Sequence, residues 1–172
     1  DAMTALVSRT QHEPTLLAEG RAHLAALLAD DTWLPASHAL PRPDRYAQYP
    51  LHRDAQGRFS VVSFVWGPGQ RTPVHNHTVW GLVGVLRGAE LCDEYTLQGT
   101  QPVPAGRCHT MQRGQIEAVS PTVGDWHRVS NALADRPRGE VQGDGMAVDR
   151  EVMAPQPAGA PYELAQLADQ RL

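Results

Sequence analysis

Three histidines form the most chemically suggestive pattern in this sequence. His75 and His77 stand two residues apart, between Gly69 and an apolar run that is typical of a β-strand, and His127 follows about fifty residues later. Residues i and i+2 of a strand point to the same face, so both imidazoles of the pair can be directed at one point. Three neutral imidazoles that converge inside a β-structure can bind a metal ion. The sequence therefore predicts a metal site at His75, His77 and His127.

The spacing of these histidines leaves the metal open. Zinc favours three histidines with one free position, where it can activate a water molecule for hydrolysis or isomerisation. Manganese, nickel and copper also accept imidazole ligands. A choice among these metals needs information beyond the three side chains.

The histidine segments resemble the two sequence motifs of the cupins. Residues 69–88 are similar to the motif Gly-x5-His-x-His-x3-Glu-x6-Gly, except that Gly81 stands where the motif has glutamate. Residues 124–131 are similar to the motif Gly-x2-His-x3-Asn. More narrowly, residues 59–82 resemble the bacterial thiol dioxygenases, which are cysteine dioxygenase-like enzymes, and especially the branch that acts on 3-mercaptopropionate. The resemblance extends from about residue 15 to about residue 137.

This resemblance implies an all-β cupin fold, a double-stranded β-helix or jelly-roll barrel with an N-terminal helical segment. Many short strand-like runs separated by glycine and proline turns agree with it. A length of 172 residues suits one domain. We therefore expect a single cupin domain over 1–172, with an N-terminal helical cap at 1–45, the barrel at 46–153 and a C-terminal tail at 154–172.

Local patterns add predictions for individual elements. Leucines at near-heptad spacing after Pro14 predict a helix through about Ala29. Glycine, proline and threonine at 98–107 predict a loop, and Ala147–Met153 is a candidate for the last strand.

The resemblance further implies Fe(II) as the cofactor, with a small thiol and O2 as substrates and a sulfinate as product. Because Gly81 replaces the glutamate of the motif, the protein ligands are three neutral imidazoles, and the site keeps the full charge of the metal. A substrate thiolate can supply the missing anionic ligand, since a thiol that coordinates a metal is deprotonated. The expected substrate is 3-mercaptopropionate, cysteine or a related thiol.

Residues that orient the substrate are also carried over from the resemblance. Gln48 and Arg150 are the candidate catalytic residues: Gln48 as a hydrogen-bond donor to a carboxylate or to oxygen, and Arg150 as a planar fork for a carboxylate. The predicted substrate pocket contains Gln48, Leu51, Trp80 and Trp126, where Leu51 stands at the place of an arginine in some relatives. No motif supports a role for His52 or His109, which we interpret as structural.

The sequence departs from the thiol dioxygenases after the third histidine. Those enzymes carry a Ser-x-His-x-Tyr relay, and Glu140, Gln142 and Asp144 occupy the corresponding positions here. Three hypotheses remain: a thiol dioxygenase without the relay, a diverged thiol oxygenase that gives a different product, and a non-enzymatic cupin that binds a small ligand or a metal. A carboxylate near the metal would favour an ammonium group on the substrate.

Composition excludes some classes of partner. A formal net charge of −4 is unlike the basic surfaces of nucleic-acid-binding proteins. No run reaches the length of a membrane span, and no signal peptide opens the chain. We therefore predict a cytoplasmic protein, a monomer or weak homo-oligomer that binds neither nucleic acid nor membranes. Cys92 and Cys108 are too few for a disulfide scaffold and are interpreted as reduced packing residues.

Overall fold

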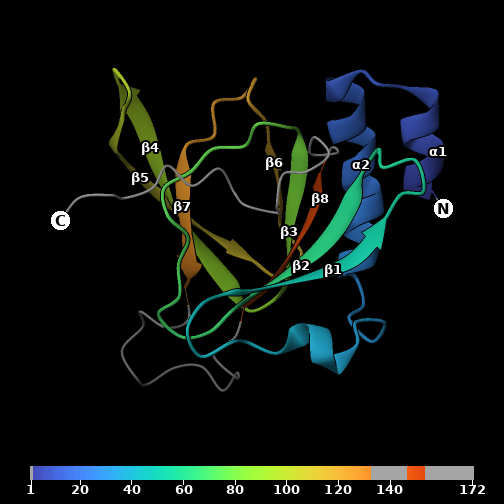
Figure 1. Ribbon diagram of the computed structural model, residues 1–172, viewed down its shortest axis with the longest axis horizontal. Helices are drawn as coiled ribbons and strands as arrows, with labels where there is room; N and C mark the ends of the chain where they lie inside the picture. The colour runs from blue at the N-terminus through green and yellow to red at the C-terminus, as the bar shows by residue number, and fades with distance from the viewer. Residues whose placement is uncertain (1, 133–146, 154–172) are drawn as a thin grey trace.

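The computed structural model describes residues 2–132 and 147–153, which form two antiparallel β-sheets and a helical layer (Figure 1). The five-stranded sheet has the order β1-β2-β8-β3-β6, and its strands are β1 (Ala47–Arg53), β2 (Ser60–Trp66), β8 (Ala147–Met153), β3 (Gly81–Arg87) and β6 (Ile116–Val119). The three-stranded sheet has the order β5-β4-β7, with β5 (Gln101–Gln112), β4 (Ala89–Gln98) and β7 (His127–Asn131). The helices are α1 (Ala2–Arg9), α2 (Glu13–Leu28) and the short 3-10 helix η1 (Ala36–Ala39).

Strand β2 is buried on both faces, which explains its continuous apolar sequence. One face, with Val61 and Val65, packs in the core beneath the helices, together with Leu24 of α2. The other face, with Val62, Phe64 and Trp66, packs against Val129 of the opposite sheet. The five-stranded sheet is therefore the middle layer between the helices and the three-stranded sheet.

Helix α2 confirms the prediction from the leucine spacing to within one residue at each end. Leu16, Gly20, Leu24 and Leu28 are its buried residues, and they recur every fourth position on one face. Helix α1 was not predicted from its sequence. Strand β8 has the bounds that the sequence predicted.

The loop predicted at 98–107 is wrong. Strand β4 continues to Gln98, a tight turn follows, and β5 begins at Gln101 with Pro102 and Pro104 inside it. Proline removes one ladder hydrogen bond, which an edge strand tolerates. Because β5 is the edge strand of its sheet, it can contain both prolines.

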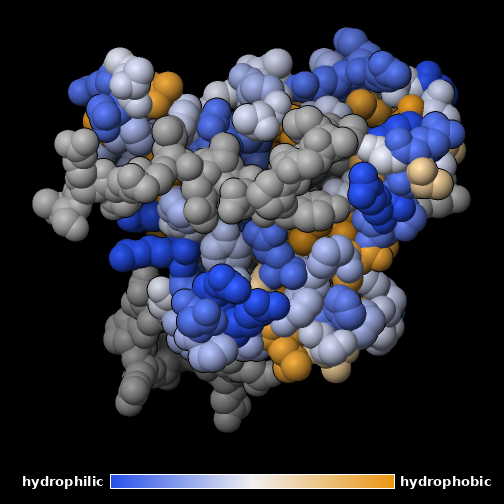
Figure 2. Space-filling view, viewed as in Figure 1, coloured by the Kyte–Doolittle hydropathy of each residue, from blue (hydrophilic) through white to orange (hydrophobic). Residues whose placement is uncertain are grey.

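The surface in Figure 2 is mainly hydrophilic on the face shown, and its hydrophobic residues gather in small, separate patches. Over the described part of the chain, neither helix has the length and apolar character needed to cross a bilayer. Most large apolar side chains are instead used in the two core clusters.

A packing prediction follows from Gly84 of β3, which faces α2. A Cβ atom at this position would lie 2.6 Å from Cδ1 of Leu28 and 3.2 Å from Cδ2 of Leu24. We expect Gly84→Ala to lower the free energy of unfolding by about 1–3 kcal/mol through overpacking. Urea unfolding in the wild-type and Leu28→Ala backgrounds measures this. Gly84→Ala should lower the free energy of unfolding by less when residue 28 is alanine than when it is leucine. Equal losses in both backgrounds would contradict the predicted clash.

Candidate metal site

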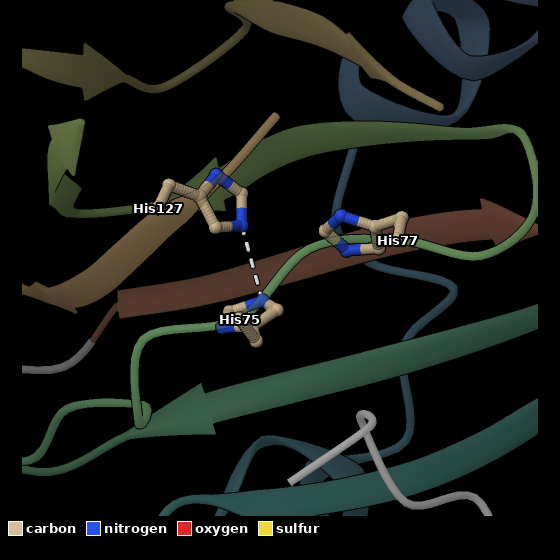
Figure 3. Close-up of side chains that lie close together, drawn as sticks. All are labelled: His75, His77 and His127. Carbon is tan, nitrogen blue, oxygen red and sulfur yellow. Dashed lines mark hydrogen bonds between the residues drawn. The ribbon is translucent and has the colours of Figure 1, made fainter. Parts of the chain in front are cut away.

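His75, His77 and His127 meet at one point between the two sheets (Figure 3). Their ligand atoms all lie within 4.8 Å of one another, and Nε2 of His75 is 3.0 Å from Nε2 of His127. The ring centroids are 4.5 Å apart for His75 and His127, and 5.2 Å apart for each pair that includes His77. The convergence expected from the sequence is thus present in the fold.

Backbone pairing brings His75 to His127. The two residues form an isolated antiparallel bridge, in which each backbone N–H donates to the carbonyl of the other at 2.9 Å. Thr72 continues this pairing, because its N–H donates to the carbonyl of Val129 at 2.8 Å. The regular strand expected around the histidine pair is absent, since β3 begins only at Gly81. An extended segment attached to β7 therefore positions the pair.

Asp125 holds the ring of His77 in place. Its Oδ2 accepts a hydrogen bond from Nδ1 of His77 at 2.7 Å and one from the backbone N–H of Ser120 at 3.0 Å. Its Oδ1 accepts from the backbone N–H of His77 at 3.2 Å. Burial raises the pKa of Asp125, but the hydrogen bonds from the ring and backbone of His77, with its favourable electrostatic interaction, outweigh burial and leave that pKa below its ordinary value. Asp125 is therefore an ionised, fixed partner of a ligand candidate.

These partners decide which nitrogen of two rings can bind a metal. Nδ1 of His75 lies 2.9 Å from the carbonyl oxygen of Pro73, which can only accept a hydrogen bond. Nδ1 of His77 faces the Asp125 carboxylate in the same way. Both Nδ1 atoms must carry the hydrogen, which leaves both Nε2 lone pairs directed at the common point.

The third ring, His127, is also kept neutral. Burial, followed by the nearby His75 and His77, lowers its pKa to about 3. Its Nδ1 lies 3.6 Å from Sγ of Cys92. Burial, and next the charge of Glu117, raises the pKa of this thiol to about 12, so Cys92 stays protonated. Cys92 contacts the ring of a ligand candidate and is not itself part of the ligand group.

A small cavity adjoins the three histidines. It has about 40 Å³ of space for water, which is room for only a few water molecules. Cys92, Glu90 and Glu117 lie in its wall, and neither lysine nor arginine occurs among its described lining residues. The remaining wall is mainly apolar and is formed by Phe64, Trp66, Val83, Met111, Val119 and Val129.

The donor set fits a divalent transition metal. Three neutral imidazoles suit Fe²⁺, Zn²⁺ and similar ions, and fixed hydrogen bonds to their outer nitrogens are typical of metal-binding histidines. No carboxylate from the described residues belongs to the group of ligand atoms. Gly81, at the place of the glutamate in the first motif, is a buried residue that opens β3.

The other predicted site residues lie outside the described cavity wall. Gln48 pairs with Phe64 across β1 and β2 and therefore shares the inner face of the sheet with that lining residue. Leu51 and Trp80 pack against the core beneath the helices. Trp126 is half-buried, and its carbonyl accepts a hydrogen bond from the N–H of Tyr95 at 2.8 Å. The roles of these residues stay predictions.

Arg150 is described only by its backbone position. It lies opposite Ser63 of β2 and Gly84 of β3, and neither partner lines the cavity. Glu140, Gln142 and Asp144 lie outside the described residues. The structure therefore leaves open what replaces the relay of the thiol dioxygenases.

Comparison with solved structures identifies the fold. An uncharacterized conserved protein with a double-stranded β-helix domain from Klebsiella pneumoniae matches with a TM-score of 0.52 and 17% sequence identity, over 76% of this chain and 95% of that chain. This chain has the double-stranded β-helix fold of the cupins. An RmlC-like cupin protein from Desulfovibrio desulfuricans matches with a TM-score of 0.44 and 20% identity, over 73% of this chain and 95% of that one. No family model matches the sequence.

Sequence reasoning missed several residues of this cupin site. Asp125 carried a usable signal, because an acidic residue stands inside the second motif, two positions before His127. Glu90 and Cys92 stand two residues apart in one strand, so their side chains share a face, but the spacing does not indicate whether that face lies inside the barrel. Glu117 had no signal in the sequence, since its approach to the cavity depends on the pairing of β6 with β3.

Removing the charge of Asp125 should weaken metal binding. Asp125→Asn keeps the volume of the side chain but loses the ionised acceptor for Nδ1 of His77, so we expect a 10–100-fold loss of metal affinity. Competition with a chromogenic chelator measures it. The matched control is Asp93→Asn, which removes the 2.8 Å ion pair of Asp93 with Arg128 but no hydrogen bond to a ligand ring, and neither residue lines the cavity. Equal losses in both variants would contradict the orienting role of Asp125.

The metal-free protein should lose stability in acid through His127. The pKa of this group is about 3 in the folded chain and has an ordinary value of 6.5, so the unfolded chain binds the proton first. Its stabilising contribution is complete above about pH 6.5 and is lost as the pH falls toward 3. Thermal melts between pH 8 and pH 4 test this, with His127→Gln as the comparison. An equally steep fall in the variant would assign the acid sensitivity to other groups.

Proposed function

We propose that this cupin binds Fe(II) at His75, His77 and His127 and oxidises a small thiol with O2 to a sulfinate. The observation that supports the proposal is the ligand group itself, which consists of three neutral imidazoles and, within the described residues, no carboxylate. The resemblance of residues 59–82 to the thiol dioxygenases adds the choice of iron and of O2.

Charge explains why such a site favours a thiol. A carboxylate ligand would cancel part of the dipositive charge of the metal, and three imidazoles cancel none. A thiol can lose its proton and approach as the thiolate, which restores the balance of charge. Bound Fe(II) would supply the reactivity toward O2. The overall reaction, RSH + O2 → RSO2H, places both oxygen atoms on sulfur and requires no additional reductant.

The cavity favours a short substrate with a positive group. About 40 Å³ of space for water suits a molecule with few heavy atoms. Glu90 and Glu117 line the wall, and the described lining residues include no cation that would pair with a carboxylate. An aminothiol therefore complements the wall better than a plain mercapto-acid does. Gln48 and Arg150 would be needed mainly for a carboxylate substrate, and both roles remain proposals.

The decisive experiment is O2 uptake by the iron-loaded protein. Fe(II) is added anaerobically, and uptake is followed with 2-aminoethanethiol, cysteine and 3-mercaptopropionate, each product being identified by mass. We expect a product two oxygen atoms heavier than the thiol, with the largest kcat/KM for the aminothiol. His77→Gln should abolish uptake, while His52→Gln, at an exposed position on β1, should keep it.

The outcomes separate the competing functions. Absence of thiol-dependent uptake at full iron occupancy would rule out the oxygenase. Tight thiol binding without oxidation would indicate a cupin that binds ligands without turnover. Zinc in the purified protein, with activity that depends on water and not on O2, would indicate a hydrolase or isomerase.

A further inference from the structure

Besides His77 and Asp125, a further pair of ionisable residues, Glu117 and His109, lies at the edge of the cavity. Glu117 is on β6 and lines the cavity, and His109 is on β5. Nε2 of His109 is shielded from solvent and lies 2.7 Å from Oε1 of Glu117, in ion-pair range but without the angle of a good hydrogen bond. Because β5 and β6 are edge strands of different sheets, the pair connects the two sheets beside the cavity.

The same imidazole also faces a surface carboxylate. Nδ1 of His109 lies 3.7 Å from Oε1 of Glu94. The other carboxylate oxygen of Glu94, Oε2, accepts a hydrogen bond from Nε of the exposed Arg107 at 2.7 Å. His109 therefore stands between two partly exposed carboxylates, of which Glu117 lines the cavity and Glu94 does not. Its two ring nitrogens, one toward each carboxylate, allow a proton to enter the ring on one side and leave on the other.

Several titratable groups surround this pair. Strand β4, which pairs with β5, carries Glu90 and Cys92 in the cavity wall and Glu94 toward the surface, and β7 carries His127. Among them, Cys92 stays a neutral thiol. Arg21 of α2 binds the carbonyl oxygen of Ile116, a residue that packs with the core under the helices. The side chains that surround the pair on β4 are thus two carboxylates and one neutral thiol.

We propose that Glu117 is the base that removes the proton of the substrate thiol, and that His109 is a positioning residue that passes this proton to the Glu94 side. The proposal rests on the proposed function, because it requires a thiol in the cavity. The S–H bond breaks, its electron pair stays on sulfur, and the proton goes to the carboxylate of Glu117. It then moves to Nε2 of His109 while Nδ1 releases its own hydrogen toward Glu94 and water.

A base is needed because free thiols are mostly protonated at neutral pH. With an ordinary pKa of about 8.5, only about 3% of a thiol is ionised at pH 7. A site without a base must wait for this fraction, which grows about tenfold for each pH unit below the pKa. A carboxylate in the cavity wall accepts the proton from the major form instead.

The test follows thiolate binding in the absence of O2, separately from oxidation. Protein loaded with Co(II) is mixed anaerobically with 2-aminoethanethiol, and the rate of formation of the thiolate-to-metal absorption band is measured from pH 6 to pH 9.5. For the wild type we expect a shallow pH dependence. For Glu117→Gln we expect a rate about 30-fold lower at pH 7, rising about tenfold per unit and reaching the wild-type rate near pH 9.5.

Two further variants keep the test specific. His109→Gln should shift the profile in the same direction as Glu117→Gln and guards against misfolding of a single variant. Glu19→Gln is the matched control, because it makes the same chemical change in an exposed ion pair of α2 with Arg9, and it should follow the wild type.

Each result is decisive. A loss of equal size at every pH in Glu117→Gln and His109→Gln would show that the pair only ties the sheets together and would overturn the relay. Absence of the band in the wild type would overturn both the relay and the proposed function. A band with the expected profiles, but no O2 uptake by the iron form, would overturn the oxygenase and leave the relay supported.

Discussion

The site depends on the antiparallel bridge between His75 and His127. Two reciprocal backbone hydrogen bonds of 2.9 Å fix these residues opposite each other, although many residues separate them in the chain. Joining such distant segments costs loop-closure entropy, which the packing of the two sheets offsets. Once the backbones are paired, the rings need little further adjustment to place their Nε2 atoms 3.0 Å apart. Backbone pairing therefore determines where the ligand rings lie.

Hydrogen bonds behind the rings then give the site its chemical character. Pro73 and Asp125 each accept the hydrogen on an Nδ1 atom, which leaves the Nε2 atoms as donors of electron pairs to a metal. Ser120 joins Asp125 to the outer layer, because its hydroxyl donates to Glu13 in the first turn of α2. The helical layer thus supports the metal site through a carboxylate, besides covering the apolar face of the sheet.

Sequence motifs predicted the centre of the site better than its surroundings. His75, His77 and His127 could be found because they belong to two short motifs, and α2 and β8 could be found from local patterns. Strand β5 could not, because its prolines are acceptable only at a sheet edge, and the order of strands is a tertiary property. The positions of Glu117 and Asp125 beside the histidines depend on the same long-range pairing.

The position of the carboxylates distinguishes this site from one with an acidic ligand. A carboxylate bound to the metal would neutralise charge permanently and compete with a thiolate for the same ion. Glu90 and Glu117 stand instead in the cavity wall, where, in the proposed reaction, they would leave the charge of the metal for the substrate and act on the groups that the substrate carries. They can attract its cationic group and take its proton. In the proposed thiol oxygenase, the glycine at position 81 and the acidic wall would therefore be complementary, because the first would create the need for an anionic sulfur and the second would help to produce it.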